Sequence, residues 1–461
     1  MLSTDKIKNV LKLALSTGGD FAEVFVEDTI RKTIVLTSGK VETVNGGQDY
    51  GIGIRICKGL KSMYGYTSDD SLESLLATTK KIATALGKIS DTEHINLNLI
   101  ENPFENAHTV VQVPNSVQSS YKISKLKEAH RGATEYSPEI TQVDVRLMEV
   151  DQKVQIANST GLLTHDRRVR TRVAVEAVAS KGEDKQTGFL APGALAGFEF
   201  VEGLDLYKLG QEAAKTAVTM LNAQYCPAGR MPVAIENGFG GVIFHEACGH
   251  SLEATSVAPG KSVFTGKLGQ QIANEKVTAI DDGTIANAWG SINIDDEGNR
   301  GQKNVLIENG ILKSYMIDMF NGRRMNMSST GSGRRESYRY APTSRMTNTY
   351  IANGNDDNDE IIKSIKYGLY AKKMGGGSVN AVTGEFNFAV VEGYIINNGK
   401  IDYPVRGASL IGTGPEVLMN IDMVGTNLEQ AQGMCGSASG LVPTNVGQPL
   451  IRVSEITVGG R

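Results

Sequence analysis

The feature that most constrains this sequence is its glycine, which is spread along the whole chain and follows no period. There are 52 glycines among 461 residues, about 11%, against about 7% in an average protein. Proline is rare, with 12 residues. Glycine at this density without a repeat indicates many turns and bulges between short strands, and it argues against a fibrous chain. We therefore expect a β-rich globular protein.

The overall composition is that of a folded protein with no general attraction to nucleic acids. Hydrophobic residues make up 40% and charged residues 21% of the chain, with a formal net charge of −4. These values exclude wholesale disorder and argue against direct nucleic-acid binding. No apolar stretch approaches the roughly 18 residues of a membrane span, so no membrane association is expected. The N-terminal residues resemble an amphipathic helix rather than an export signal, which predicts a cytoplasmic protein whose four cysteines stay reduced.

The hydrophobic pattern changes near the turn Pro227–Gly229. Before that turn, helical and strand patterns alternate, with Ser68 expected to cap the second helix and Asn158–Gly161 to form a hairpin turn. The elements expected there are helices over 3–16, 72–86, 116–130 and 206–221, and strands over 21–27, 33–36, 51–57, 143–150, 154–158 and 169–179. After the turn, short strands and Gly-rich turns dominate, interrupted by helices over 239–254 and 359–373. The predicted fold is α+β, with an N-terminal α/β domain over 1–226 and a β-rich C-terminal domain over 227–461.

The segment His245-Glu246-Ala247-Cys248-Gly249-His250 follows a short apolar run and combines residue types used by zinc hydrolases. Imidazole is a common zinc ligand, and a carboxylate beside a bound water can act as a general base. On a regular α-helix, histidines five positions apart would be separated by about 140°, too far to hold one ion. Metal binding therefore predicts a distorted helix between Glu246 and His250, which Gly249 would permit. The alternative is two ordinary histidines on a buried helix.

Two histidines leave a catalytic zinc site short of a protein ligand, because such sites usually have three. Cys435 is the preferred third ligand, since it lies in the flexible segment Gly433–Ser437 among small neighbours and thiolate binds zinc strongly. Cys248 is the competing thiol, although its position favours packing, and Cys57 and Cys226 are expected to be core thiols. The other histidines belong to no motif: His94, His108, His130 and His165.

Three further groups of charged residues receive structural interpretations. Arg168, Arg170 and Arg172 alternate on one strand face, which favours a solvated face or a dimer contact. The acidic run Asp295–Glu297 does not have the spacing of a calcium loop and is expected in a solvated loop. Basic and aromatic residues alternate over 334–345, which favours a polar loop that, in a functional role, would hold peptide carboxylates.

The segment His245–His250, together with Glu253 and Ala254, resembles the HExxxH signature of the TldD/PmbA family of metallopeptidases. The resemblance continues through 375–388 and 404–418 to 447–449 and 456–460, and it is weaker around 38–66. The intact motif resembles the TldD-like branch of the family rather than the PmbA/TldE-like branch, which has lost it. This sequence departs from many relatives at Ser437–Gly440, where a Lys and a Gln are expected.

This resemblance implies a peptidase that holds Zn²⁺ through His245, His250 and Cys435, with a metal-bound water as nucleophile and Glu246 as general base. It also implies a two-domain subunit that dimerises around an enclosed chamber, with an identical chain or an inactive TldE/PmbA-like relative. Small or unfolded peptides would be the substrates. The alternative is a catalytically silent, peptide-binding or regulatory subunit of the gyrase-modulator kind, with a structural metal.

Three consecutive glycines are the candidate substrate-binding residues: Gly375, Gly376 and Gly377. A run without side chains could let the backbone of a substrate add to a sheet as an extra strand. A plain bend is the alternative.

Overall fold

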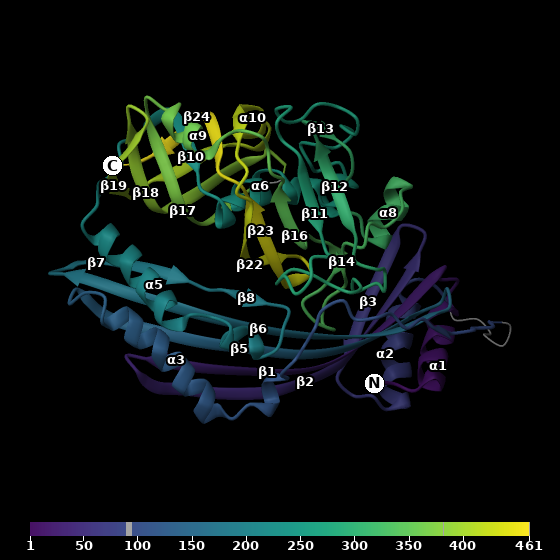
Figure 1. Cartoon of the computed structure of the whole chain (residues 1–461). Coiled ribbons are helices and arrows are strands. Elements are labelled where there is room, and N and C mark those ends of the chain that lie inside the picture. The colour runs from purple at the N-terminus through teal and green to yellow at the C-terminus, as the bar shows by residue number, and fades with distance from the viewer. Residues whose placement is uncertain (89–94, 381, 461) are drawn as a thin grey trace.

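The computed structural model describes residues 1–88, 95–380 and 382–460, and it contains two eight-stranded sheets and one six-stranded sheet. One eight-stranded sheet, formed by the N-terminal part of the chain, lies along the bottom of Figure 1, and the other two sheets stand above it. This mixture of helices and sheets confirms the expected α+β class. Among the residues described, none of the helices is long and apolar enough to cross a membrane.

The N-terminal sheet is built from very long antiparallel strands. β1 (Phe21–Thr37) pairs with β2 (Lys40–Lys58) and with β5 (Ile140–Asn158), and β5 pairs with β6 (Leu162–Lys181). The shorter strands of this sheet are β3 (Lys61–Thr67), β4 (Ile100–Glu101), β7 (Asp184–Leu190) and β8 (Gly193–Ala194).

The sequence predicted β1 and β5 each as two short strands, because their apolar alternation stops in the middle. Buried polar residues occupy that middle, where Thr29 and Gln152 donate hydrogen bonds to the Glu27 carboxylate over 2.6 and 3.0 Å. The same carboxylate accepts a hydrogen bond from the backbone N–H of Tyr338, which is 311 residues away. The strands therefore continue through a polar contact with the C-terminal part of the chain.

Four helices supply most of the apolar packing of the N-terminal sheet. α1 (Thr4–Leu15) and α2 (Leu72–Thr84) share one apolar cluster with strands β1 and β2, while α3 (Ser119–Thr134) and α5 (Leu206–Leu221) share another with β5 and β6. Short helical turns flank them at η1 (Pro114–Ser116) and α4 (Glu199–Glu202).

The boundaries of these helices largely follow the sequence prediction. Ser3 caps α1, and α5 has the predicted limits. The second helix is capped by Ser71 rather than by Ser68, because the Ser71 hydroxyl accepts from the N–H of Ser74. The predicted turn at Asn158–Gly161 is confirmed, with Gly161 at a φ of 104°.

The second eight-stranded sheet closes on itself. β17 (Tyr367–Val379) pairs with β10 (Gly229–Ile235) on one side and with β18 (Glu385–Asn397) on the other. β24 (Ile451–Gly459) and β20 (Ser409–Thr413) complete the ring between β10 and β18. The other strands of this sheet are β9 (Gln224–Tyr225), β19 (Lys400–Arg406) and β21 (Ile421–Val424).

The helix predicted over 359–373 is wrong in its second half. α9 (Asn358–Lys363) is short, and β17 begins at Tyr367. Residues 369–371 alternate between two apolar clusters, since Leu369 and Ala371 face one and Tyr370 faces the other, which is the period of a strand. Gly375–Gly377, expected in a turn, lie inside β17.

The six-stranded sheet has the order β13-β12-β11-β16-β23-β22. β22 (Glu429–Ser437) is its edge strand and pairs with β23 (Gly440–Gln448) on one side. The remaining strands are β11 (Ala279–Asp282), β12 (Lys303–Glu308), β13 (Ile311–Leu312) and β16 (Asn348–Ile351), while β14 (Gly333–Arg334) and β15 (Thr343–Ser344) form a separate pair. The helical elements nearby are η2 (Gly238–Gly241), α6 (Val242–Ala247), η3 (Gly249–Leu252), α7 (Ala254–Val257), α8 (Met319–Met325) and α10 (Gly414–Asn420).

A buried network of ion pairs joins the N-terminal sheet to the chain above it. Glu23 on β1 contacts Arg335 over 2.5 Å and Arg55 over 2.7 Å, and Arg55 also contacts Glu297 over 2.8 Å. Arg168 contacts Asp296 over 2.6 Å. All of these side chains are almost completely buried.

Three expectations from the sequence are corrected by this network. Arg168 and Arg170 are buried rather than solvated, and Arg170 donates to the carbonyls of Trp289 and Ser291. Asp295–Glu297 is buried rather than a solvated loop. The basic segment 334–345 is also largely buried, although Arg339 stays exposed beside Asp49. Charged residues that alternate on a strand can face either solvent or another polar surface of the protein. Here they face another part of the same chain.

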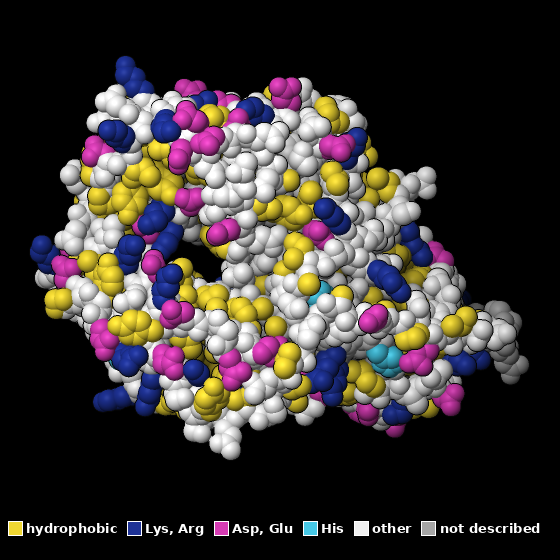
Figure 2. Space-filling view, in the orientation of Figure 1, with side chains coloured by type: hydrophobic (Ala, Val, Ile, Leu, Met, Phe, Trp, Pro, Cys, Tyr) yellow, Lys and Arg dark blue, Asp and Glu magenta, His cyan; other side chains and the backbone are white. Residues whose placement is uncertain are grey.

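The surface is hollowed between the N-terminal sheet and the closed ring. Figure 2 shows this opening at the centre left, in the region below β17 and above β8 in Figure 1. The network described above lies on one side of it, and a contact between Thr216 of α5 and Glu392 of β18, at 3.1 Å, lies on the other. The N-terminal sheet is thus joined to the region of Glu297 and Arg335 by the network and to the ring by the Thr216–Glu392 contact.

Candidate metal centre

Two histidines and a cysteine converge on one point above the N-terminal sheet. One possible ligand atom from each of His245, His250 and Cys435 lies within 4.8 Å of the other two. The Cys435 Sγ atom is 3.4 Å from Nε2 of His250, and the two imidazole rings are nearly perpendicular, with centroids 5.0 Å apart. The three residues that the structure brings together are therefore the three that were predicted from the sequence as metal ligands.

The backbone between the two histidines is distorted, as the sequence predicted. α6 ends at Ala247, Cys248 has φ −130° and ψ −48°, and the tighter helix η3 begins at Gly249. This break turns His250 towards His245. A side chain at position 249 would be obstructed, because a Cβ there would lie 2.4 Å from the Met346 sulfur. Any larger residue at the break would therefore require the Met346 side chain to move.

The two thiols that competed in the sequence occupy different environments. Cys248 is fully buried in the apolar core, and burial raises the pKa of its thiol well above the usual value. Burial also acts on Cys435, but the two histidines outweigh it and lower the pKa of this thiol well below the usual value. Thiolate is the form that binds metals, so Cys435 is the better donor. Cys57 and Cys226 are buried free thiols, as expected.

Glu246 lies beside the convergent group without belonging to it. Its Oε2 atom is 3.7 Å from Nε2 of His250, and its side chain is 19% exposed. It lines two cavities, of about 200 and 500 Å³, that meet at Cys435. A carboxylate in this place can accept a proton from a molecule held at the centre.

The donor set fits a zinc ion. Two imidazoles and a thiolate are typical catalytic zinc ligands and leave a position open. Nδ1 of His245 is buried without a hydrogen-bond partner among the described residues, so this ring is not committed to another contact. The other histidines with a described position, His108, His130 and His165, are not part of the group, and His94 lies outside the described residues.

A free strand edge faces this centre. Among the residues described, β17 pairs with β10 only through Leu369–Ala371, so the outer edge of its second half is unpaired. Gly376 and Gly377 from that half line the smaller cavity together with Met434 of β22. Gly376 and Gly377 therefore lie next to the candidate metal ligands, in a strand and not in a bend, while Gly375 belongs to the same strand and lines neither cavity.

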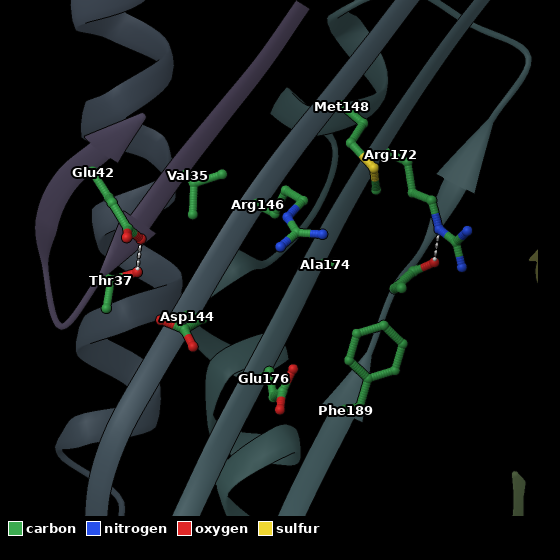
Figure 3. Close-up of a pocket in the computed structure, with 11 residues that line it drawn as sticks. Val35, Thr37, Glu42, Asp144, Arg146, Met148, Arg172, Ala174, Glu176 and Phe189 are labelled. Atoms are coloured by element: carbon green, nitrogen blue, oxygen red, sulfur yellow. Dashed lines mark hydrogen bonds between the residues drawn. The ribbon is translucent and has the colours of Figure 1, made fainter. Parts of the chain in front are cut away.

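Sequence reasoning missed a further cavity, of about 230 Å³, on the N-terminal sheet. Figure 3 shows Asp144, Arg146, Glu176 and Arg172 projecting from the sheet, with helices behind it. Arg172 also donates to the Gln432 carbonyl over 3.2 Å, which connects this cavity with β22. The available signal was the alternation of charged residues on two neighbouring strands, of which only Arg168, Arg170 and Arg172 were interpreted, as a solvated face or a dimer contact.

Two residues near the centre were also missed as functional candidates. In the sequence analysis, Glu253 was considered only as part of the family signature, and Arg345 only as part of the basic segment 334–345. Glu253 is almost buried and lies 3.2 Å from His250, and Arg345 is fully buried and contacts the backbone of Cys435. The three-residue spacing between His250 and Glu253 was the signal that could have identified the carboxylate.

Comparison with known proteins agrees with this geometry. The chain matches three consecutive family models: PmbA/TldA metallopeptidase domain 1 over residues 22–83, the central domain over 113–221 and the C-terminal domain over 228–460. It is 37% identical to a protein of Haemophilus influenzae named Metalloprotease TldD homolog, over 100% of this chain and 97% of that one. It is 25% identical to a protein of Saccharolobus solfataricus named Zinc metalloprotease TldD homolog, over 98% of this chain and 99% of that one.

Solved structures share the fold over almost the whole chain. A crystal structure from Thermotoga maritima, described as a candidate modulator of a DNA gyrase, is similar with a TM-score of 0.79 at 20% identity, covering 99% of each chain. TldE from Thermococcus kodakarensis is similar with a TM-score of 0.74 at 18% identity, covering 99% of this chain and 100% of that one. From the family models and the sequence relatives together, this chain belongs to the PmbA/TldD family of metallopeptidases.

Proposed function

We propose that this protein is a zinc-dependent peptidase of the HExxxH type. The observation that carries the proposal is the convergence of His245, His250 and Cys435 on one point, with the Glu246 carboxylate beside it and a cavity in front. The name of the Saccharolobus relative supports zinc as the metal. Zinc in this position would polarise a carbonyl and make a bound water more acidic.

In this proposal each residue of the chain has a separate task. His245, His250 and Cys435 hold the ion, and the thiolate offsets part of its charge. Glu246 accepts a proton from the attacking water at a carboxylate oxygen and returns it to the leaving amine, which is general base and then general acid catalysis. Its partial exposure to the cavity supports this task, because the substrate has to reach it.

The substrate proposed is a small or unfolded peptide in an extended conformation. Supporting this, the unpaired edge of β17 presents Gly376 and Gly377 beside the centre, and Gly375 precedes them in the same strand. A peptide strand could pair with that edge through main-chain hydrogen bonds, which do not depend on its sequence.

We further propose a cytoplasmic dimer that encloses the cavity, with an identical chain or an inactive TldE/PmbA-like relative as partner. The similarity to TldE from Thermococcus kodakarensis supports a partner of this kind. Residues 1–226 and 227–461 are the proposed domains, because all strands of the N-terminal sheet lie before that boundary and the strands of the two upper sheets lie after it, apart from the two-residue strand β9.

The second candidate function is a catalytically silent, peptide-binding or regulatory subunit with a structural metal. It is favoured by the gyrase-modulator description of similar solved structures. A structural zinc site has four protein ligands and no open position, whereas the group here has three.

Metal analysis of the purified full chain, coupled to cleavage of an unfolded peptide with and without a chelator, tests the proposal. Near-stoichiometric zinc and chelator-sensitive cleavage are expected. Zinc that remains bound in a protein without cleavage activity would favour the silent subunit. An absence of zinc after reconstitution with Zn²⁺ would contradict both functions.

A further inference from the structure

We infer that Glu253 and Arg345 are positioning residues, which together hold the His250 ring and the Cys435 strand in the arrangement that binds the metal. This inference rests on the proposed function, and it concerns two side chains that lie outside the convergent group itself. Glu253 lines the larger cavity beside His250, Arg345 lines neither cavity, and neither residue is assigned a catalytic role.

Glu253 contacts the side of His250 that faces away from the other ligands. Its Oε2 atom lies 3.2 Å from Nδ1 of His250, while Nε2 of the same ring lies 3.4 Å from the Cys435 sulfur. The two ring nitrogens point in different directions, so one imidazole bridges carboxylate and metal centre. A carboxylate that accepts a hydrogen bond from Nδ1–H stabilises the tautomer in which the lone pair of Nε2 is free to bind a metal. The same hydrogen bond fixes the orientation of the ring.

The position of Glu253 is held by its own backbone environment. The neighbouring N–H of Ala254 donates to the Met316 carbonyl over 2.8 Å, and the N–H of Met316 donates to the Leu252 carbonyl over 3.0 Å. Glu253 is only 3% exposed. The backbone is therefore fixed on both sides of Glu253, and the side chain is almost buried at the wall of the larger cavity, where its contact with His250 is strengthened by the low exposure.

Arg345 connects this carboxylate to the strand that carries Cys435. Its guanidinium donates to the Cys435 carbonyl, to the Ser439 hydroxyl over 3.0 Å and to the Gly440 carbonyl over 2.8 Å. Its Nε atom is 3.8 Å from Oε1 of Glu253. The planar guanidinium has five donors in a fixed geometry, so one buried side chain can set the distance between the β22–β23 hairpin and Glu253.

The two remaining polar atoms of this arrangement face each other. Among the residues described, Oε1 of Glu253 and Nε of Arg345 are buried and have no hydrogen-bond partner, and they form an ion pair with each other over 3.8 Å. Removing either charge takes away the ion-pair partner of the other buried group. His250 and Cys435 come from distant parts of the sequence, and this pair links their surroundings.

The test measures zinc affinity of the full chain, with a competing chromophoric chelator and metal-free protein. Glu253→Gln keeps the size of the side chain, and its affinity for Zn²⁺ is expected to fall about 10–100-fold. Glu149→Gln is the matched control, because Glu149 is equally buried at 3% and pairs with Lys122 over 2.6 Å in the N-terminal sheet. The control is expected to lower stability and to leave zinc affinity unchanged.

Arg345→Lys provides a second variant that keeps the charge and loses the planar donors. With Co²⁺ in place of zinc, Glu253→Gln is expected to keep the thiolate-to-metal absorption band while the ligand-field bands shift, and Arg345→Lys is expected to weaken the thiolate band. Wild-type affinity and spectra in both variants would overturn the inference and leave the proposed function intact. If the wild-type chain itself binds neither Zn²⁺ nor Co²⁺, both are overturned.

Discussion

The Sγ atom of Cys435 lies 3.4 Å from Nε2 of His250, although 185 positions separate the two residues in the chain. His250 follows a break between two short helices, and Cys435 lies in the edge strand of a six-stranded sheet. The contact exists because α6 packs against β16 and β23 of that sheet. The metal centre is therefore a product of tertiary packing in the C-terminal part of the chain, and neither element could form it alone.

Replacing the sulfur tests whether this contact marks a metal ligand. Cys435→Ser is expected to lose most of its bound zinc, because a hydroxyl is a much poorer zinc ligand than a thiolate. Zinc per chain would be measured by elemental analysis after dialysis. Cys248→Ser is the control, since this thiol is buried in the core outside the group, and it is expected to keep its zinc while losing some stability. Loss of zinc only in the Cys248 variant would mean that the other thiol is the ligand.

Glu246→Gln separates proton transfer from metal binding. The side chain lies beside the three candidate ligands and is not one of them, so zinc content is expected to stay unchanged. Peptide cleavage is expected to fall about 10²–10⁴-fold in kcat, the usual contribution of a general base. Steady-state cleavage of an unfolded peptide, with zinc content measured on the same sample, decides the matter. Cleavage at the wild-type rate would remove Glu246 from this role.

Local features of the site could be predicted from the sequence, because each depends on a few neighbouring residues. The spacing of His245 and His250 required a break in the helix, and Gly249 marked where it would occur. The small residues around Cys435 indicated a segment whose backbone can come close to the histidines. Helix α5 was predicted in full because its apolar face and its cap at Asp205 are both local.

Long-range polar contacts could not be predicted in the same way. Arg168 and Glu297 look like surface residues in the sequence, and they are buried because distant segments supply their polar partners, Asp296 for Arg168 and Arg55 for Glu297. Similarly, nothing local distinguishes Arg345 from the other arginines of its segment. For Gly375–Gly377 the sequence left a plain bend open as the alternative, because glycine disfavours strands and the pairing with β18 is a tertiary effect.

The buried ion pairs between the N-terminal sheet and the rest of the chain are expected to be sensitive to truncation. Arg335→Leu leaves the Glu23 carboxylate with Arg55 as its remaining partner in a buried site, at a cost of about 3 kcal/mol in the free energy of unfolding. Arg339→Leu removes an exposed pair with Asp49 and is expected to cost less than about 1 kcal/mol. Urea unfolding measures the free energy of unfolding of both variants. Equal losses in the two variants would contradict the prediction that the buried pair contributes more than the exposed one.

Stability is expected to depend on pH through Glu297. Burial, together with the nearby carboxylates of Asp318 and Asp295, raises the pKa of Glu297 to about 8, although Arg55 acts in the opposite direction. The unfolded chain has an ordinary glutamate pKa near 4.5, so between these values the folded protein retains a proton that the unfolded chain releases. The contribution of this group to the free energy of unfolding therefore falls as pH rises from about 5 to 8, by up to about 1.4 kcal/mol per pH unit.

Glu297→Gln removes this titration, so the difference in unfolding free energy between wild type and variant reports it directly. The free energy of unfolding of the wild type minus that of the variant is expected to fall as pH rises from about 5 to 8. Urea unfolding at constant ionic strength measures it at several pH values. If this difference stays constant or rises with pH, Glu297 is already ionised in the folded protein at the lower pH.

The glycines of β17 allow the substrate edge to be tested apart from the fold. A Cβ at Gly376 would meet no atom within 4 Å, so Gly376→Val is expected to fold and to bind zinc normally. Its branched side chain would stand in the cavity beside the centre, and KM for an extended peptide is expected to rise at least severalfold. Gly377→Val is the contrasting variant, because its Cβ would lie 2.1 Å from the Phe388 ring, and it is expected to lose stability. An unchanged KM in a folded Gly376→Val protein would place the substrate elsewhere.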